Sequence, residues 1–471
     1  MSVSIKYILF ILIIVLYLVS RLYRLEELYT FSFDQYRDAW EVKKIIVDKK
    51  LTLIGPQSSY YGIFYGPLFF YLLVPFYWIT NLSPLGGAYA AVFFGLTTLI
   101  LLYFIGTTFF SSRVGIIASL IYVFSLNINL LNRNCRNDPP LMSFSLILLL
   151  FIWKIFKSKK KDFKVIPSFF LGLIAGLGFH FHFSAVVFPL LLISSLLIIK
   201  KRNLLLNIIS IAFGFLFALL PLFIFDYRHS FIISRAFMAL SADIREVSYI
   251  NNFYLNIILF MHSLYKIIVP EQLLRFFKIL LLLTSLIFIF IFLYKRIFKT
   301  KIFIFKIMIL WIFIPLIIFS FYIKQSNDYY YLMNFPVFIL FFAACLEYSS
   351  KNKLAPFVLF FLGLMFIVNL EFLPKIINNR NLTLANKAIE FIKNDSSGKP
   401  VTIDYLSTDN FKVGFEYLVY YYRVSIYKDN SNSSKYRSYT IFVPASKNKD
   451  LYYKAVFGDI GINILYEKSE N

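Results

Sequence analysis

The chain has 471 residues, of which 59% are hydrophobic and 15% are charged, and it carries a net charge of +23. Soluble domains are about 45 to 50% apolar and about 25% charged, so this composition excludes a soluble protein and predicts one that lies mostly in lipid. The basic residues fall in short clusters between apolar stretches, as positive-inside topology signals do, which argues against nucleic acid as a partner.

Apolar stretches recur along the chain at about the length of membrane-spanning helices. A hydrocarbon core of about 30 Å is crossed by a helix of about 20 residues. The segments that approach this length are 6–22, 88–110, 114–131, 139–156, 204–225, 276–294, 303–323, 331–348 and 354–373. The run 167–199 is too long for one crossing and is interrupted by His180 and His182, so we predict a hairpin of two short spans there. The total is about eleven spanning helices.

Clusters of Lys and Arg in the short loops set the predicted orientation, because such residues are retained in the cytoplasm. The clusters are Lys157 to Lys164, Lys200 to Arg202, Lys295 to Lys301, and Lys351 with Lys353. With Lys6 also inside, the segments left outside are the loop holding Asp34, the loop holding Asp138, the loop from Asp226 to Glu271 and the tail from Leu373. We therefore predict a multi-pass protein of the plasma (cytoplasmic) membrane with a cytoplasmic N-terminus and an extracytoplasmic C-terminus.

One apolar segment, 67–80, is too short to cross, because about 14 residues make a helix of only about 21 Å. It also contains Pro75. A crossing here would reverse every later loop, so we place it in the outer interface, where its Tyr and Trp side chains are favourable. The first outer loop, 23–87, is thus predicted to carry interfacial helices.

The composition changes after Leu373. Residues 374–471 are polar enough to face water, and they alternate between helix-like and strand-like patterns. The predicted elements are a helix near 382–393, a strand at 401–405, a helix near 411–423 and a strand at 439–444. We expect a transmembrane domain over 1–373 and a small extracytoplasmic α/β domain over 374–471.

Two acids stand out in the predicted outer loops. Asp34 closely follows the first membrane exit, and Asp138 lies in a short, highly charged loop, INLLNRNCRNDPPLMSF. Each has a structural interpretation, Asp34 as the cap of a helix that starts near Tyr36 and Asp138 as an N-cap before a proline. With Arg37, Arg133 and Arg136 nearby, the pair also offers what sugar transfer from a phosphate-linked donor requires, a base for the acceptor and cations for the leaving phosphate.

Short motifs in the same region carry a resemblance to a known family. They read FDQYRDA at 33–39, LIGP at 53–56, GPLFFYLLVPFY at 66–77, FHFSAVVFP at 181–189 and FDYRHSF at 225–231. In this order, over roughly residues 5–345, the chain resembles glycosyltransferase family 39 of the C-type membrane glycosyltransferases, and most closely its bacterial members. Protein O-mannosyltransferases and aminoarabinose transferases are relatives. The resemblance implies an all-α polytopic fold of C-type architecture.

The resemblance also implies roles for individual residues. Asp34 matches the family's first-loop acid, its expected general base, and Asp138 matches the second-loop acid. Arg133 matches an arginine of the mannosyltransferase relatives. Gln35 stands where many relatives have Glu, which weakens the case for a metal or a paired acid. No cofactor is therefore assigned, and a divalent metal stays open.

Further residues are candidates for binding the donor phosphate. His180 and His182 are expected at the tip of the predicted hairpin, about where relatives place a Lys; the alternative is a pair of histidines that bond to backbone in the turn. Arg228 and His229 follow a spanning helix at the outer face, where they either bind phosphate or anchor the helix end, and the resemblance favours phosphate.

A third outer loop holds Lys324 and Tyr329, and relatives often place a basic or Tyr-containing phosphate contact there. An aromatic belt at the membrane surface is the simpler explanation of the tyrosines.

Together these inferences predict an inverting glycosyltransferase that moves a hexose or pentose from a polyprenyl-phosphate donor to an extracytoplasmic hydroxyl of a protein, lipid or glycan. The donor's lipid tail would explain the many spans. Two alternatives stay open, a transporter or flippase of lipid-linked sugars and a polysaccharide polymerase or ligase. A transporter should show repeated halves and polar residues at mid-membrane depth, whereas the polar residues here gather on one face.

Overall fold

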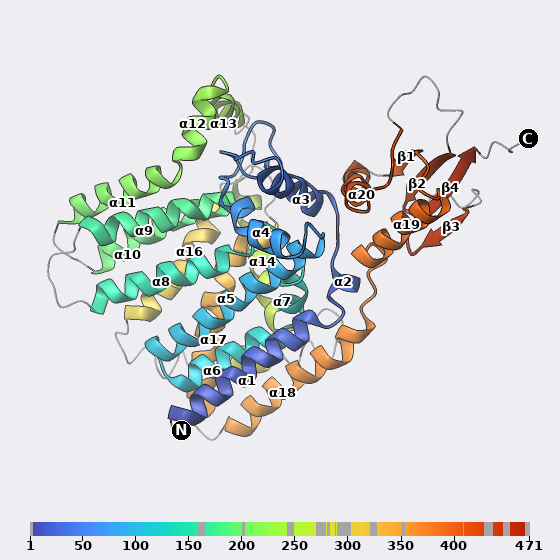
Figure 1. Ribbon diagram of the computed structural model, residues 1–471. Coiled ribbons are helices and arrows are strands. Elements are labelled where there is room, and N and C mark those ends of the chain that lie inside the picture. The colour runs from blue at the N-terminus through green and yellow to red at the C-terminus, as the bar shows by residue number, and fades with distance from the viewer. Residues whose placement is uncertain are drawn as a thin grey trace, which may run out of the picture.

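The computed structural model is a long helical body with a small sheet domain at one end (Figure 1). The residues that the structure describes are 3–157, 165–199, 203–242, 249–269, 279, 283–287, 289, 303–320, 327–350, 354–407, 409–427, 437–445 and 453–466. The expected fold class, helical in the membrane with a small C-terminal sheet domain, is confirmed.

The helical body is built from apolar helices that lie roughly side by side. They are α1 (Val3–Leu22), α5 (Leu85–Phe109), α6 (Ser112–Phe124), α8 (Leu141–Lys157), α9 (Val165–Leu177), α10 (Val187–Ile199), α11 (Leu204–Ala218), α16 (Phe303–Ser320), α17 (Phe335–Ser349) and α18 (Ala355–Phe372). Within the described ranges, 5 helices are long and apolar enough to cross a membrane, or 6 if the bent pair of α11 and α12 (Leu220–Arg228) is one span. The chain is therefore a multi-pass membrane protein. The count of about eleven spans and the orientation stay predictions, because segment 276–294 and the basic clusters lie largely outside the described residues.

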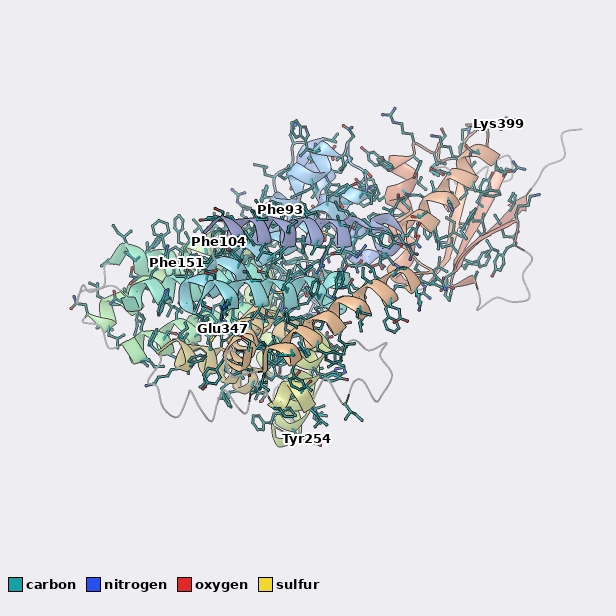
Figure 2. All side chains as sticks on the ribbon, turned by 90° about the horizontal axis from the view of Figure 1, so that it is seen from below. Phe93, Phe104, Phe151, Tyr254, Glu347 and Lys399 are labelled. Carbon is teal, nitrogen blue, oxygen red and sulfur yellow. The ribbon has the colours of Figure 1, made fainter. Side chains whose placement is uncertain are left out.

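Large aromatic side chains cover the outside of this body. Figure 2 labels Phe93 and Phe104 on α5, which are about half exposed. A water-soluble protein would bury most such residues in its core, but exposed apolar side chains are favourable against lipid.

The predicted hairpin is present and packs tightly against the next helix. α9 and α10 are joined by two short 3-10 turns, η1 (Gly178–His180) and η2 (Phe183–Val186), so the histidines lie at its tip. A Cβ on Gly172 of α9 would lie 1.9 Å from the carbonyl oxygen of Ile211 in α11, and a Cβ on Gly214 would lie 2.0 Å from that of Phe169. The two glycines therefore allow the backbones of α9 and α11 to touch.

The first loop, 23–87, folds into short helices over one end of the helical body. They are α2 (Leu25–Leu28), α3 (Phe33–Ile46) and α4 (Leu68–Ile79). α4 is the predicted interfacial segment, and it buries Phe69 and Leu73 while Trp78 and Ile79 are exposed at its end. α4 packs against both α3 and α5, so it supports the helix that carries Asp34.

The segment from Asp226 to Glu271, predicted as an outer loop, contains helices that the sequence did not predict. This stretch contains α13 (Ile232–Ala242) and the long helix α14 (Tyr249–Ile268), and Glu271 itself lies outside the described residues. α14 packs against α16, and the Asn256 amide donates a hydrogen bond to the carbonyl oxygen of Phe319, 3.1 Å away. Polar residues such as Asn256 and Lys266 lower the mean hydropathy of this segment, although one face of the helix is buried. A simple search for apolar runs therefore misses it.

The C-terminal domain follows the predicted order of helix and strand. Its elements are α19 (Leu382–Asp395), β1 (Val401–Ser407), α20 (Asp409–Tyr421), β2 (Arg437–Val443), β3 (Ala455–Phe457) and β4 (Ile460–Tyr466). The sheet order is β1-β2-β4-β3; β1 and β2 are parallel, and β4 is antiparallel to both of its neighbours. The prediction missed β3 and β4, which form a short hairpin through the tight turn at Gly458.

The C-terminal domain rests on the first loop through α20 and α3. The Tyr36 hydroxyl donates to the Glu416 carboxylate over 2.8 Å, and the ring of Trp40 meets Tyr417 edge to face at 5.3 Å. The Tyr417 hydroxyl also donates to the carbonyl oxygen of Leu82, 2.7 Å away. The domain thus fixes α3 from the side opposite the cavity described next.

Candidate active site

A polar cavity of about 670 Å³ lies where four segments from distant parts of the sequence meet. These segments are the first loop, the second loop (132–140) between α7 (Leu126–Leu131) and α8, the tip of the α9–α10 hairpin, and η5 (Asp328–Asn334). The predicted site residues that line it are Asp34, Arg37, Asp138, His182 and Tyr329. The structure therefore brings together the two acids that the sequence placed in separate loops.

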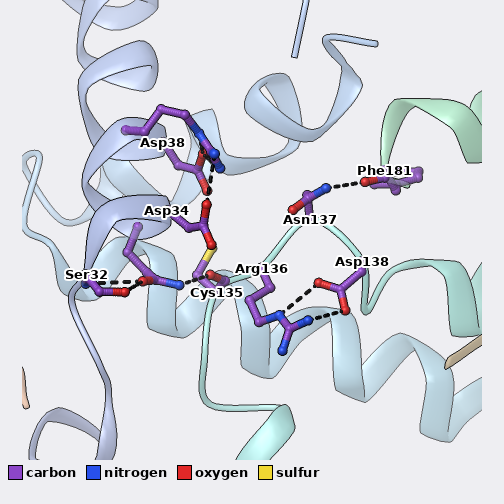
Figure 3. Close-up of polar contacts among 10 residues, drawn as sticks. Ser32, Asp34, Asp38, Cys135, Arg136, Asn137, Asp138 and Phe181 are labelled. Atoms are coloured by element: carbon purple, nitrogen blue, oxygen red, sulfur yellow. Dashed lines mark hydrogen bonds and ion pairs between the residues drawn. The ribbon is translucent and has the colours of Figure 1, made fainter. Parts of the chain in front are cut away.

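Asp34 lies in the first turn of α3 and does not cap this helix. The cap is Ser32, whose backbone N–H donates to the Gln35 side-chain oxygen over 3.2 Å, as in a capping box. The side-chain nitrogen of Gln35 donates to the carbonyl oxygen of Cys135 over 2.6 Å (Figure 3). Gln35 thus ties the first loop to the second, and the Asp34 carboxylate is left free of capping.

Arg37 is held between two carboxylates of α3. Its Nη1 donates to Asp34 over 2.9 Å, while its Nε and Nη2 donate to one oxygen of Asp38 over 2.9 and 2.7 Å. The two acids differ in environment, since the Asp34 side chain is 55% exposed and that of Asp38 is 1% exposed. Arg37 therefore joins a solvated carboxylate in the cavity to a buried one behind it.

Burial raises the pKa of Asp38 to about 7, although the positive charge of Arg37 acts in the opposite direction. Burial alone would lower the pKa of Arg37, but the charges of Asp38 and Asp34 outweigh it and raise that pKa. Arg37 therefore stays cationic at any physiological pH, and Asp38 can change its charge near neutrality.

Asp138 forms a two-point ion pair with Arg136 of the same loop. Arg136 Nε and Nη2 donate to the two carboxylate oxygens of Asp138 over 2.9 and 2.8 Å (Figure 3). The Asp138 side chain therefore binds Arg136 and does not take the predicted N-cap role. Asp138 is buried, and burial raises its pKa. The Arg136 guanidinium lies over the ring of Tyr329, 5.1 Å from its centroid. The acid and the aromatic ring thus fix the direction of this cation at the cavity wall.

His182 presents a neutral imidazole to the cavity. Its Nδ1 accepts the backbone N–H of Ser184 over 3.1 Å, so the ring proton is on Nε2. Burial, together with the charge of Arg136, lowers its pKa to about 3. The ring meets Tyr329 and Tyr330 edge to face at 5.3 and 4.9 Å. His182 is therefore a fixed, uncharged hydrogen-bond donor.

Two residues predicted as phosphate ligands, Arg133 and His180, do not line this cavity and bond to backbone groups. Arg133 is fully buried and donates to Asn129 over 2.8 Å, to the Tyr23 carbonyl over 2.6 Å and to the Ser20 carbonyl. It thereby satisfies carbonyl groups at the C-terminal end of α1. His180 accepts the backbone N–H of Leu68 at Nδ1 and donates from Nε2 to the carbonyl oxygen of Ala218, as the backbone-bonded alternative anticipated.

The remaining candidates lie elsewhere. Arg228 and His229 end α12, which projects with α13 from the helical body (Figure 1). Both are exposed, and His229 stacks on Phe225 with 3.9 Å between centroids. Lys324 lies outside the described residues.

Polar residues in and behind the cavity were not assigned to the site from the sequence. Arg136 was noted only as a neighbour of Asp138, although an arginine two residues before an acid is well spaced to pair with it. Asp38 stands four residues after Asp34, one helical turn on, and this spacing was the available signal. Tyr330, next to Tyr329 in the same loop, also lines the cavity, and its place there depends on the fold of η5.

An apolar pocket of about 260 Å³ adjoins the polar cavity. Tyr65, His182 and Tyr330 line both spaces, and the apolar pocket continues along Phe179, Phe183, Phe237 and Ile318. A ligand with a charged head and a hydrocarbon tail could thus occupy both spaces at once.

Comparisons with known proteins agree with this architecture. The family model "Dolichyl-phosphate-mannose-protein mannosyltransferase" matches residues 65–225, which include α4 and the second loop. ArnT from Cupriavidus metallidurans, in its crystal structures bound to undecaprenyl phosphate and in the apo state, is 11% identical, with TM-scores of 0.63 and 0.62 and 98% of each chain covered. The chain has the fold of the C-type membrane glycosyltransferases. The resemblance inferred from the motifs is confirmed.

A second C-type glycosyltransferase shows the same likeness at lower coverage. It is the archaeal oligosaccharyltransferase AglB from Archaeoglobus fulgidus in complex with an inhibitory peptide and a dolichol-phosphate, 11% identical, with a TM-score of 0.52 over 98% of this chain and 75% of that one. A search of the curated proteins finds no match.

The described residues that line this cavity are not arranged as a set of metal ligands. Among the side chains that the structure describes, no group of three or more His, Cys, Asp and Glu residues converges that could hold a metal ion. Asp34 is paired with Arg37, and the Gln35 side chain is hydrogen-bonded to Ser32 and Cys135.

Proposed function

We propose that this protein is an inverting glycosyltransferase that moves a sugar from a polyprenyl-phosphate donor to a hydroxyl of an extracytoplasmic acceptor. The observation that carries the proposal is the single cavity in which Asp34 meets two arginines beside an apolar pocket. The bound undecaprenyl phosphate of ArnT, a protein with the same fold, supports this class of donor.

The proposed base is Asp34. Its carboxylate is the more exposed of the two acids at Arg37 and faces the cavity, so an acceptor hydroxyl can reach it. As the acceptor oxygen attacks the anomeric carbon, its proton passes to Asp34 and the bond from that carbon to the phosphate oxygen breaks. Attack from the face opposite the phosphate inverts the anomeric configuration.

The departing polyprenyl phosphate would be held by the cationic wall. Arg37 and Arg136 supply charged N–H donors, and His182 supplies its Nε2–H. The Tyr329 hydroxyl is an additional donor. Asp138 acts through Arg136, which it keeps pointed along the wall. Fixed donors aimed at the developing phosphate charge stabilise the transition state more than flexible ones do.

The lipid tail would enter the apolar pocket between Phe183, Phe237 and Phe319. The acceptor would approach the cavity from the water side, where the Asp34 side chain is exposed. Protein, lipid and glycan hydroxyls all suit this chemistry. The orientation predicted from the basic clusters puts the cavity at the extracytoplasmic face.

The test compares the envelope glycans of cells that contain the wild-type protein, lack it, or contain only the Asp34→Asn variant. Mass spectrometry of surface glycans and glycoproteins should show one sugar that is lost both without the protein and with the variant. The variant must be present in the membrane at wild-type amounts. Full retention of every sugar with Asp34→Asn would contradict the proposal.

A further inference from the structure

Behind the proposed site lies a carboxylate that the mechanism does not use. Asp38 is fully buried, one helical turn after Asp34, and both Nε and Nη2 of Arg37 donate to its Oδ1. Its other oxygen, Oδ2, is buried and has no hydrogen-bond partner among the described residues. A buried carboxylate with one unsatisfied oxygen is costly, so its presence requires a reason other than stability.

The geometry of Arg37 suggests that reason. A guanidinium has five N–H groups, and the two bonds to Asp38 fix the guanidinium plane from behind. Nη1 then points to Asp34, at the cavity. One N–H on each terminal nitrogen is not used in these bonds. Without Asp38, the side chain of Arg37 would be anchored only by Asp34. Asp34 loses its charge when it takes the acceptor's proton, so it would then hold Arg37 less firmly.

We propose that Asp38 is a positioning residue that holds Arg37 in the orientation needed to bind the donor phosphate. The proposal rests on the proposed function, because it assumes that Arg37 binds that phosphate. When Asp34 becomes protonated during transfer it loses its charge, and the Asp38 pair keeps the guanidinium in place. Asp38 touches neither donor nor acceptor.

Neighbouring groups leave Asp38 dependent on Arg37. The side chains around it from other elements are Tyr29, Tyr77 of α4 and Cys135 of the second loop. Burial raises the pKa of each of these three groups well above its ordinary value, so they are neutral and supply no positive charge. On α3 itself, Asp34 and Glu41 are both acidic. Arg37 is the cation that these surroundings provide for Asp38.

The test is a double-mutant cycle on purified protein, with undecaprenyl phosphate as the probe and its Kd as the measurement. Arg37→Gln and Asp38→Asn should each weaken binding about tenfold, the effect of losing about 1.4 kcal/mol of binding free energy. The double variant should bind no more weakly than Arg37→Gln, because Asp38 acts through Arg37. Asp48→Asn, just past the end of the same helix and paired with Lys43, is the matched control and should bind as the wild type does.

The outcomes separate this proposal from the proposed function. If Asp38→Asn binds like the wild type while Arg37→Gln binds weakly, the positioning role is wrong and the phosphate site stands. If the two losses multiply in the double variant, Asp38 acts independently of Arg37, which also overturns the proposal. If Arg37→Gln binds normally, the phosphate site itself is wrong.

A purely structural role is checked by thermal unfolding. Ionised Asp38 is disfavoured in the folded protein, because burial raises its pKa to about 7. At pH 8 the neutral Asp38→Asn variant should therefore melt no lower than the wild type. Asp38→Ser provides a second neutral variant. A lower melting temperature for both variants with an unchanged Kd would show that Asp38 only supports the fold.

Discussion

The side-chain amide of Gln35 donates to the carbonyl oxygen of Cys135 over 2.6 Å, and this bond joins two loops 100 residues apart. Gln35 follows Asp34 directly, and Cys135 precedes Arg136. The bond therefore sets the base of the proposed reaction against the cation of the second loop. A glutamate at this position would place a carboxylate against a carbonyl oxygen, which explains locally why Gln35 suits this chain.

Removing this link should misplace the two halves of the site. We expect Gln35→Leu to lower kcat/KM for sugar transfer by about 10 to 100-fold, because a shift of about 1 Å in a reacting group has effects of this size. Steady-state kinetics on purified protein would measure it. Lys44→Leu, an exposed position on the same helix, is the control and should change kcat/KM less than twofold. Equal kinetics for Gln35→Leu and the wild type would show that the loops are held by other contacts.

Arg136 should contribute directly to binding the donor phosphate. Arg136→Gln removes a charged donor from the cavity wall, so the Kd for undecaprenyl phosphate should rise about tenfold. The control is Arg113→Gln, an exposed arginine of α6 that does not line this cavity. If both variants weaken binding equally, the effect reflects net charge and not this site.

Arg133 should act on stability and not on binding. Its guanidinium satisfies carbonyl groups at the end of α1 from a fully buried position, so Arg133→Met leaves these groups without donors. We expect the melting temperature to fall by about 5 °C or more, with the Kd of the folded fraction within about twofold of the wild type. A tenfold higher Kd at an unchanged melting temperature would return Arg133 to the phosphate site.

Binding should depend on pH through Asp38. Its pKa is about 7, so as pH falls through this value Asp38 gains a proton and loses its charge interaction with Arg37. The affinity for undecaprenyl phosphate should therefore fall on the acid side of pH 7, and the Asp38→Asn variant should lack this component. The phosphate itself also titrates near pH 6, so the difference between the two curves is the measurement. Parallel curves for both proteins would contradict this prediction.

The sequence predicted the parts of the structure that depend on local pattern. The hairpin around His180, the short helix at 67–80 and the first elements of the C-terminal domain follow from hydrophobic length and periodicity, and all are present. α14 was missed because polar residues on one face hide an apolar face on the other. A topology built by alternating inside and outside loops cannot include a helix that hydropathy does not reveal.

The site was only partly predictable, for a related reason. Asp34 and Asp138 could be chosen because they lie in predicted outer loops and match the loop acids of the family that the motifs resemble. Arg133 and Arg136, three residues apart in one loop, could not be told apart from the sequence. The fold turns Arg133 toward α1 and Arg136 toward the cavity. Which arginine meets solvent is decided by the packing of α1 against this loop, and that is a long-range property.

The central claim is that Asp34 takes the proton of the acceptor hydroxyl. The most direct measurement is turnover of purified wild type and Asp34→Asn, with the polyprenyl-phosphate sugar extracted from membranes of the cells that make this protein, alongside the Kd for undecaprenyl phosphate. We predict that the variant loses transfer by about 100-fold or more while its Kd changes by less than about threefold. Near-wild-type turnover of Asp34→Asn would contradict the account.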